Sequence, residues 1–180
     1  EQAQRLQASG TEYWICPGTS SWQSFTGRHS NMLANVALAA EAGRQHGATA
    51  YLVTDWGDFG HWQPDAVSWL GQVAGACQAW NPDATQDHVR EQTRMHVIPL
   101  RCAGLAESLE GLGRLVEVSG TSCRNATPWF MFLRRPTDGA IPRDVGGLTV
   151  GGLTDTEDRA QEIARVLEGR MDAADPGNPA

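Results

Sequence analysis

The segment Ala48-Thr-Ala-Tyr-Leu-Val-Thr54, followed directly by Asp55-Trp-Gly-Asp-Phe-Gly-His-Trp-Gln63, indicates the fold more clearly than any other part of the chain. Residues 48–54 form a short apolar run of β-prone side chains, which predicts a buried strand. Residues 55–63 are too polar and too rich in glycine to be a helix or a strand. We therefore predict a strand that ends in a functional loop, because ligands of parallel α/β folds bind at the carboxyl ends of strands.

A second strand and a helix precede this segment. Residues 13–16 (Tyr-Trp-Ile-Cys) are apolar and are followed by the turn residues 17–21 (Pro-Gly-Thr-Ser-Ser). Residues 32–46 carry apolar side chains at helical spacing, and Gly47 stands where a helix commonly ends. The two strands start about 35 residues apart, which is the length of a β-α-β unit. Both are apolar throughout rather than alternating, which predicts a parallel sheet buried on both sides.

The rest of the chain predicts helices. Residues 67–80 form a helix rich in small side chains that can pack closely on the sheet. Residues 83–96 and 100–118 are predicted as helices with charged faces, and a final helix is expected from a cap at Thr154 or Asp155 to about residue 171. We divide the chain into a sheet-containing part (1–80), a helical region (81–172) and a disordered tail (173–180).

Two strands do not make a domain, because both sheet edges would stay unpaired. We therefore expect the chain to belong to a longer one that supplies the remaining strands. The fold class that we predict is α/β, with residues 1–80 as the last two β/α units of a (β/α)8 TIM barrel, followed by an α-helical C-terminal extension.

Composition limits the function classes. The chain of 180 residues has a net charge of −7, which argues against nucleic acid or an anionic membrane surface as a partner. No apolar run approaches the roughly 20 residues needed to span a bilayer. The four cysteines lack the spacing of a zinc or disulfide motif, so we expect buried thiols in a reducing compartment and a cytoplasmic location.

Tryptophan and carboxylate side chains mark the candidate site. Five of the seven tryptophans fall between Trp14 and Trp69. In the loop 55–63, a carboxylate beside an indole is a common way to hold a sugar, because the carboxylate accepts bonds from hydroxyl groups and the ring stacks on the sugar face. We predict a sugar site at the carboxyl end of the two strands. Its candidate substrate-binding residues are Trp22, Asp55, Trp56, Asp58, His61 and Trp62.

Polar residues in and near this loop also allow roles other than sugar binding. Arg28, near the start of the first helix, either pairs with a loop carboxylate or only packs beneath the loop. Asp55, Asp58 and His61 have the chemistry of metal ligands, which gives a metal-dependent hydrolase as an alternative, although their spacing matches no recognised metal motif. Asp55 and Asp58 are too close in sequence to flank a glycosidic bond at the required separation, so we assign no catalytic residue to this chain.

Several motifs together resemble bacterial family 20 glycoside hydrolases, the β-N-acetylhexosaminidase-like enzymes. They are Pro17-Gly-Thr-Ser-Ser-Trp22, Gly27-Arg28, Asn31, Asn35, Gly47-Ala48, Thr54-Asp-Trp-Gly-Asp58 and Gly60-His-Trp-Gln63. The resemblance implies that residues 13–16 and 48–54 are the seventh and eighth strands of the barrel. Trp56-Gly57-Asp58 looks like the family's Trp-x-Glu motif, with Asp in place of Glu. The family's Tyr-x-Asp has no counterpart here, and Trp22 lies near its place.

The resemblance also implies an activity. Enzymes of this family hydrolyse terminal N-acetyl-hexosamine or a related sugar from glycans by a substrate-assisted, retaining mechanism. Their catalytic Asp-Glu pair lies on the fourth strand, so it is expected upstream of this chain, and no metal or organic cofactor is expected. The alternative in another class is a non-catalytic sugar-binding relative of the barrel. A mono- or oligosaccharide is the expected ligand in both cases.

Overall fold

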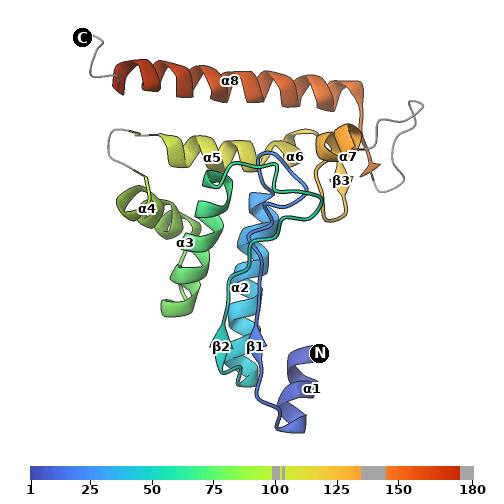
Figure 1. Ribbon diagram of the computed structural model, residues 1–180, viewed down its shortest axis with the longest axis vertical. Coiled ribbons are helices and arrows are strands. Elements are labelled where there is room, and N and C mark those ends of the chain that lie inside the picture. The colour runs from blue at the N-terminus through green and yellow to red at the C-terminus, as the bar shows by residue number, and fades with distance from the viewer. Residues whose placement is uncertain (99–101, 103, 135–144, 175–180) are drawn as a thin grey trace.

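The computed structural model describes residues 1–98, 102, 104–134 and 145–174. Its elements, in chain order, are α1 (Gln2–Ser9), β1 (Trp14–Ile15), α2 (His29–His46), β2 (Ala50–Tyr51), α3 (Ala66–Trp80), α4 (Gln86–His96), α5 (Leu105–Gly113), α6 (Leu115–Val118), β3 (Ser122–Cys123), α7 (Pro128–Arg134), β4 (Val145–Gly146) and α8 (Val150–Ala174). Figure 1 shows α8 lying across α5 and α6, with β1, β2 and α2 extending away from them. None of the described helices combines the length and apolar character needed to cross a membrane.

The predicted strand–helix–strand unit is confirmed. Strands β1 and β2 pair in parallel, with Trp14 opposite Ala50. The pairing continues beyond the regular strands, because the amide of Thr54 donates to the carbonyl of Pro17 at 2.8 Å and the amide of Thr19 donates to the carbonyl of Thr54 at 2.9 Å. The two following loops therefore start side by side, and Figure 1 shows both running from the strands toward α6 and α7.

Helices α2 and α3 cover one face of the strand pair. The hydroxyl of Tyr51 donates to the carbonyl of Val36 in α2 at 3.0 Å. A Cβ atom at Gly75 of α3 would overlap the side chain of Val53, so only glycine allows the helix to lie this close. The prediction that residues 67–80 form a helix packed closely on the sheet is confirmed. Gly47 ends α2 in the left-handed conformation, also as predicted.

The other face of the strand pair is uncovered in the described part of the chain. Trp14 is 61% exposed and Leu52 is 46% exposed. The prediction that both faces are buried is therefore wrong for these residues, because no second layer lies against this face. The prediction that the cysteines are buried is wrong for Cys16, which follows β1 and is exposed. The other three cysteines are half-buried.

The helical region differs from the prediction at several places, and it contains the short strands β3 and β4 and the helix α7, which were not predicted. Of the helix expected over residues 100–118, residues 100, 101 and 103 lie outside the described part. The remainder is helical from Leu105 and is interrupted at Arg114, between α5 and α6. The final helix begins at Val150, ahead of the predicted cap. The hydroxyl of Thr154 donates back to the carbonyl of Val150 at 3.1 Å, so this residue lies inside the helix. Helix α8 includes residues 173–174 of the predicted tail, and residues 175–180 lie outside the described part.

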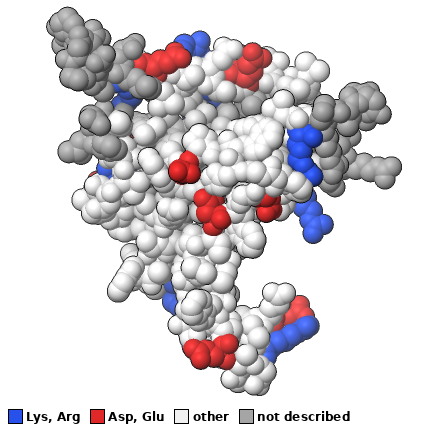
Figure 2. All heavy atoms as spheres, viewed as in Figure 1, with Lys and Arg blue, Asp and Glu red and all other residues white. Residues whose placement is uncertain are grey.

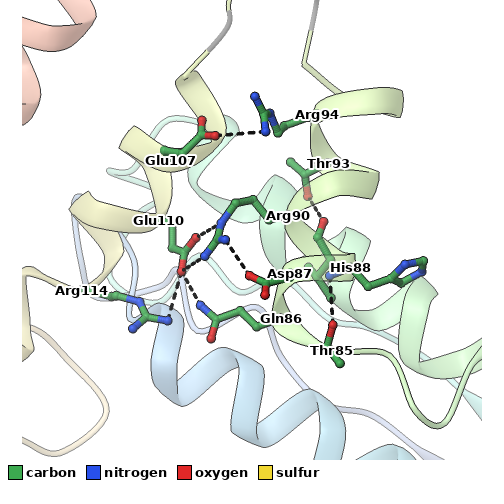
Figure 3. Close-up of polar contacts among 11 residues, drawn as sticks. Thr85, Gln86, Asp87, His88, Arg90, Thr93, Arg94, Glu107, Glu110 and Arg114 are labelled. Carbon is green, nitrogen blue, oxygen red and sulfur yellow. Dashed lines mark hydrogen bonds and ion pairs between the residues drawn. The ribbon is translucent and has the colours of Figure 1, made fainter.

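A carboxylate clasp joins α4 to α5 (Figure 3). The side chain of Glu110 in α5 is only 10% exposed and accepts hydrogen bonds from Arg90 at 2.8 and 3.1 Å. Gln86 donates to the same carboxylate, and Arg114 lies 3.1 Å from it. Burial by itself raises the pKa of Glu110, but the arginines outweigh it, so the pKa is lowered and the group is anionic.

The start of α2 is buried beside this clasp. His29 is 1% exposed, and its Nε2 lies 3.2 Å from the carbonyl of Val67. A Cβ atom at Gly113 of α5 would overlap the imidazole. Burial lowers the pKa of His29 below its usual value, so the ring is neutral. Helix α5 of the helical region thus packs against the start of α2, the helix that supports the candidate site.

Candidate functional site

The carboxylate of Asp55 ties together the loops that follow β1 and β2. Its Oδ1 accepts hydrogen bonds from the hydroxyls of Thr19 at 2.7 Å and Ser21 at 2.5 Å. Ser68 at the start of α3 donates to the hydroxyl of Ser21 at 2.9 Å, so three segments join in one hydrogen-bond network around this carboxylate. This arrangement leaves Oδ2 as the oxygen that faces His61, at 3.7 Å from its Nε2.

The hydroxyl groups keep Asp55 charged. Partial burial on its own raises the pKa of this carboxyl group, but the hydrogen bonds from Ser21, Ser68 and Thr19, and then the nearby His61, outweigh it. The pKa is therefore lower than usual, and Asp55 is an anion at neutral pH. A carboxylate held in this way accepts hydrogen bonds from a ligand but has no proton to donate.

Exposed aromatic rings stand beside the carboxylate. Trp56 is 55% exposed, Phe59 is 56% exposed and Trp62 is 51% exposed. The indoles are nevertheless fixed, because Trp56 donates to the hydroxyl of Thr54 at 2.9 Å and Trp62 donates to the carbonyl of Phe59 at 3.0 Å. Rings that are rigid and exposed offer stacking surfaces at low entropic cost.

Asp58 and His61 complete the second loop. Asp58 accepts one long hydrogen bond, of 3.5 Å, from Gln23 of the first loop. The Nε2 of His61 lies 3.3 Å from the amide nitrogen of Gln63. Asp55, Asp58 and His61 do not converge on a common point, and the described residues contain no group of three or more His, Cys, Asp or Glu side chains that could hold a metal ion. The geometry therefore gives the metal-ligand alternative no support.

Trp22 lies in the first loop as a fixed ring. A Cβ atom at Gly18 would lie 2.5 Å from its benzo edge, so the ring packs directly on the backbone. The guanidinium of Arg28 stands 5.3 Å from the ring centroid. Arg28 does not pair with a loop carboxylate; its Nη2 donates instead to Asn125 at 3.3 Å. Of the two interpretations of Arg28, packing beneath the loop is the one that the structure bears out.

Two asparagines of α2 support the first loop. Asn31 donates to the hydroxyl of Ser20 at 2.7 Å, and Asn35 accepts from the amide of Gly18 at 3.0 Å. Both contacts hold the loop that leaves β1, which accounts for polar side chains on this face of the helix. The first loop is thus held in place by hydrogen bonds to α2 and to Asp55.

A segment from the helical region, which was not predicted to lie there, also borders the site. Trp22 donates to Asn125 at 3.0 Å, across more than a hundred residues of sequence. The buried ring of Phe130 in α7 packs against Trp62, with the centroids 5.7 Å apart. Arg134 lies over the ring of Phe59, at 3.2 Å from its centroid. Such long-range contacts have no local pattern from which they could be predicted.

Strained backbone concentrates at the same place. Among the described residues, the non-glycine residues in the left-handed conformation are Ser20, Gln23, Phe59 and Asn125. All of them lie in the three segments that border the site. For a bulky residue such as Phe59, with φ of 61°, this conformation is costly and persists only where surrounding contacts impose it. The clustering favours a functional role for these segments.

Two hollows elsewhere contain none of these residues. One, of about 280 Å³, lies between α4, α5 and α8 and is lined by residues such as Arg94, Glu107 and Arg170. The other, of about 300 Å³, lies between α3 and α4 beside Trp80. The candidate site is instead an open wall of loops. In the view of Figure 2, acidic atoms lie over the middle of the molecule, and further acidic and basic atoms lie toward its top and bottom.

Comparison with protein-family models, with curated proteins and with solved structures finds no match to this chain. The resemblance to family 20 glycoside hydrolases therefore rests on the sequence motifs alone.

Proposed function

We propose that this chain is the carbohydrate-binding part of a glycoside hydrolase resembling β-N-acetylhexosaminidases. The observation that carries the proposal is the pair of adjacent loops after two parallel strands, joined at Asp55 and bearing exposed indoles beside carboxylates. Trp56 and Trp62 offer ring faces on which a pyranose can stack. Asp58 and the Oδ2 of Asp55 accept hydrogen bonds from its hydroxyl groups.

The uncovered face of the strand pair supports the barrel context. In α/β proteins, parallel sheets are covered on both faces. Trp14 and Leu52 present apolar side chains on a face that the described residues leave open. In our proposal, further strands of a parent chain cover this face and supply the catalytic Asp-Glu pair. The hydrolysed bond is that of a terminal N-acetyl-hexosamine or a related sugar, and the mechanism is retaining. The spacing of the cysteines, which matches no disulfide or zinc motif, favours a cytoplasmic location.

A non-catalytic sugar-binding relative of the barrel is the second candidate. It is favoured by the absence of a suitably separated pair of carboxylates among the described residues of the two loops, where Asp55 is bound to hydroxyls of the same site. Both candidates share the same ligand wall and differ only in whether the parent chain carries the acid.

The affinity of the chain for N-acetylglucosamine tests the proposal directly. We expect calorimetric or NMR titration to detect binding, and we expect Asp58→Ala to weaken it by about tenfold, because two hydroxyl hydrogen bonds lose their acceptor. Asp87→Ala, at an exposed carboxylate of α4, is the matched control and should leave binding unchanged. Equal affinities of the wild type and the Asp58→Ala variant would remove Asp58 from the site.

A further inference from the structure

The segment 122–134 reaches the candidate site through both backbone and side chains. The amide of Thr127 donates to the carbonyl of Gln23 at 3.0 Å, which fastens the segment to the first loop. The Oδ1 of Asn125 accepts two hydrogen bonds, from the indole of Trp22 at 3.0 Å and from Arg28 at 3.3 Å. One carboxamide oxygen therefore holds two side chains of the first loop.

The indole of Trp22 is fixed at three points. Its benzo edge packs on Gly18, its ring lies beside the guanidinium of Arg28, and its N–H is bound by Asn125. Of these three, only Asn125 comes from the helical region. A ring that is held before a ligand arrives binds more tightly than one that must be ordered on binding.

The backbone at Asn125 favours this residue type. Its φ is 58°, in the left-handed region that asparagine tolerates better than most residues. Alanine or leucine here would lose the acceptor and add strain. Glycine adopts this φ without strain but lacks the side chain, and aspartate retains an acceptor oxygen. The position thus offers a matched pair of variants that separate backbone from side-chain effects.

We infer that Asn125 is a positioning residue for Trp22, and that the segment 122–134 forms a third wall of the sugar site. Arg134 over Phe59 and Phe130 against Trp62 extend this wall to the second loop. The part of the inference that concerns the ligand rests on the proposed function. The part that concerns the orientation of Trp22 does not, because it depends only on contacts within the protein.

The indole N–H resonances of the 180-residue protein test both parts. The Trp22 signal is assigned as the one that Trp22→Phe removes. In Asn125→Gly we expect this signal to shift and its proton to exchange faster with water, while Asn125→Asp restores slow exchange. We also expect Asn125→Gly to weaken binding of N-acetylglucosamine by about three- to tenfold, the effect of losing one neutral hydrogen bond.

The outcomes are distinguishable. An unchanged Trp22 signal in Asn125→Gly overturns the positioning role. A changed signal with unchanged affinity overturns the role in ligand binding. If the wild type does not respond to N-acetylglucosamine, the proposed function and the ligand part both fail, while the indole signal still decides the positioning of Trp22. Should Asn125→Gly not fold, by circular dichroism, Asn125→Ser removes the same acceptor and replaces it in each comparison.

Discussion

The hydroxyl of Ser21 donates a hydrogen bond to Oδ1 of Asp55 at 2.5 Å. This bond joins the two loops that follow the parallel strands β1 and β2. The two residues are 34 positions apart in sequence. Because Thr19 donates to the same oxygen, the first loop stabilises the negative charge of the second. Asp55 is therefore a structural element of the wall as well as a predicted ligand contact.

Removal of these hydroxyl groups should loosen the loops. We expect Ser21→Ala to lower the free energy of unfolding by about 1–2 kcal/mol, because the buried network loses a donor to Asp55. Urea denaturation measures this effect. Ser30→Ala is the matched control, since Ser30 lies on the adjacent helix outside the network, and it should change stability by less than about 0.5 kcal/mol. Equal effects of the two substitutions would contradict a structural role for the Ser21–Asp55 bond.

The clasp at Glu110 should contribute more stability than the nearby surface ion pair. We expect Glu110→Gln to lower the free energy of unfolding by about 2 kcal/mol, because it removes the buried negative charge that Arg90 and Arg114 share. Glu107→Gln breaks only the exposed pair with Arg94 and should cost about 0.5 kcal/mol or less. Thermal or urea unfolding of the two variants compares them directly, and similar losses would contradict the importance that we assign to burial.

Stability should fall as the solution is acidified below the usual pKa of histidine. His29 has a lowered pKa in the folded state, so below about pH 6.5 the unfolded chain takes up a proton that the folded chain does not. The free energy of unfolding should then decrease by up to about 1.4 kcal/mol per pH unit. Glu110 and Arg114 face the imidazole and act in opposite directions, and Glu110 with its lowered pKa loses its own contribution only at lower pH.

Urea denaturation between pH 8 and pH 5 measures this slope. In His29→Gln, which keeps a donor for the carbonyl of Val67, the slope between pH 7 and pH 5.5 should be smaller than in the wild type. A slope that is unchanged in the variant would assign the pH dependence to other groups.

The 180-residue chain by itself should not hydrolyse an aryl N-acetyl-glucosaminide. In our proposal the catalytic Asp-Glu pair lies on an earlier strand of a parent chain, and the charged Asp55 has no proton to give to a leaving group. Release of the aryl alcohol, followed by absorbance, measures the activity. Turnover that disappears in Asp55→Asn would show that we have assigned the wrong role to this carboxylate.

The local part of the fold could be predicted from the sequence, and the long-range part could not. The apolar runs, the helical spacing before Gly47 and the glycine-rich loop 55–63 are local signals, and the parallel unit β1–α2–β2 followed from them. The break at Arg114 was missed because apolar spacing continues through it. The start of α8 was missed because Thr154 resembles a helix cap, whereas its hydroxyl bonds back within the helix.

The site shows the same division. The candidate residues of the loop 55–63 could be proposed from the sequence because Trp, Asp and Gly stand together in it. The contacts of Asp55 with Ser21 and of Trp22 with Asn125 depend on tertiary packing, so no periodic pattern in the sequence predicts them. The burial of the strands was overestimated because their composition reflects a second face that the described residues do not cover.

The most direct measurement of the central claim is the response of the indole N–H resonances to N-acetylglucosamine. The chain contains its own control, because Trp80 is 91% exposed and lies at the end of α3, outside the candidate site. Our account predicts saturable shifts for Trp22, Trp56 and Trp62 and none for Trp80. Shifts of equal size at all exposed indoles, or no shift at the three site residues, would contradict the assignment of these loops as a sugar-binding wall.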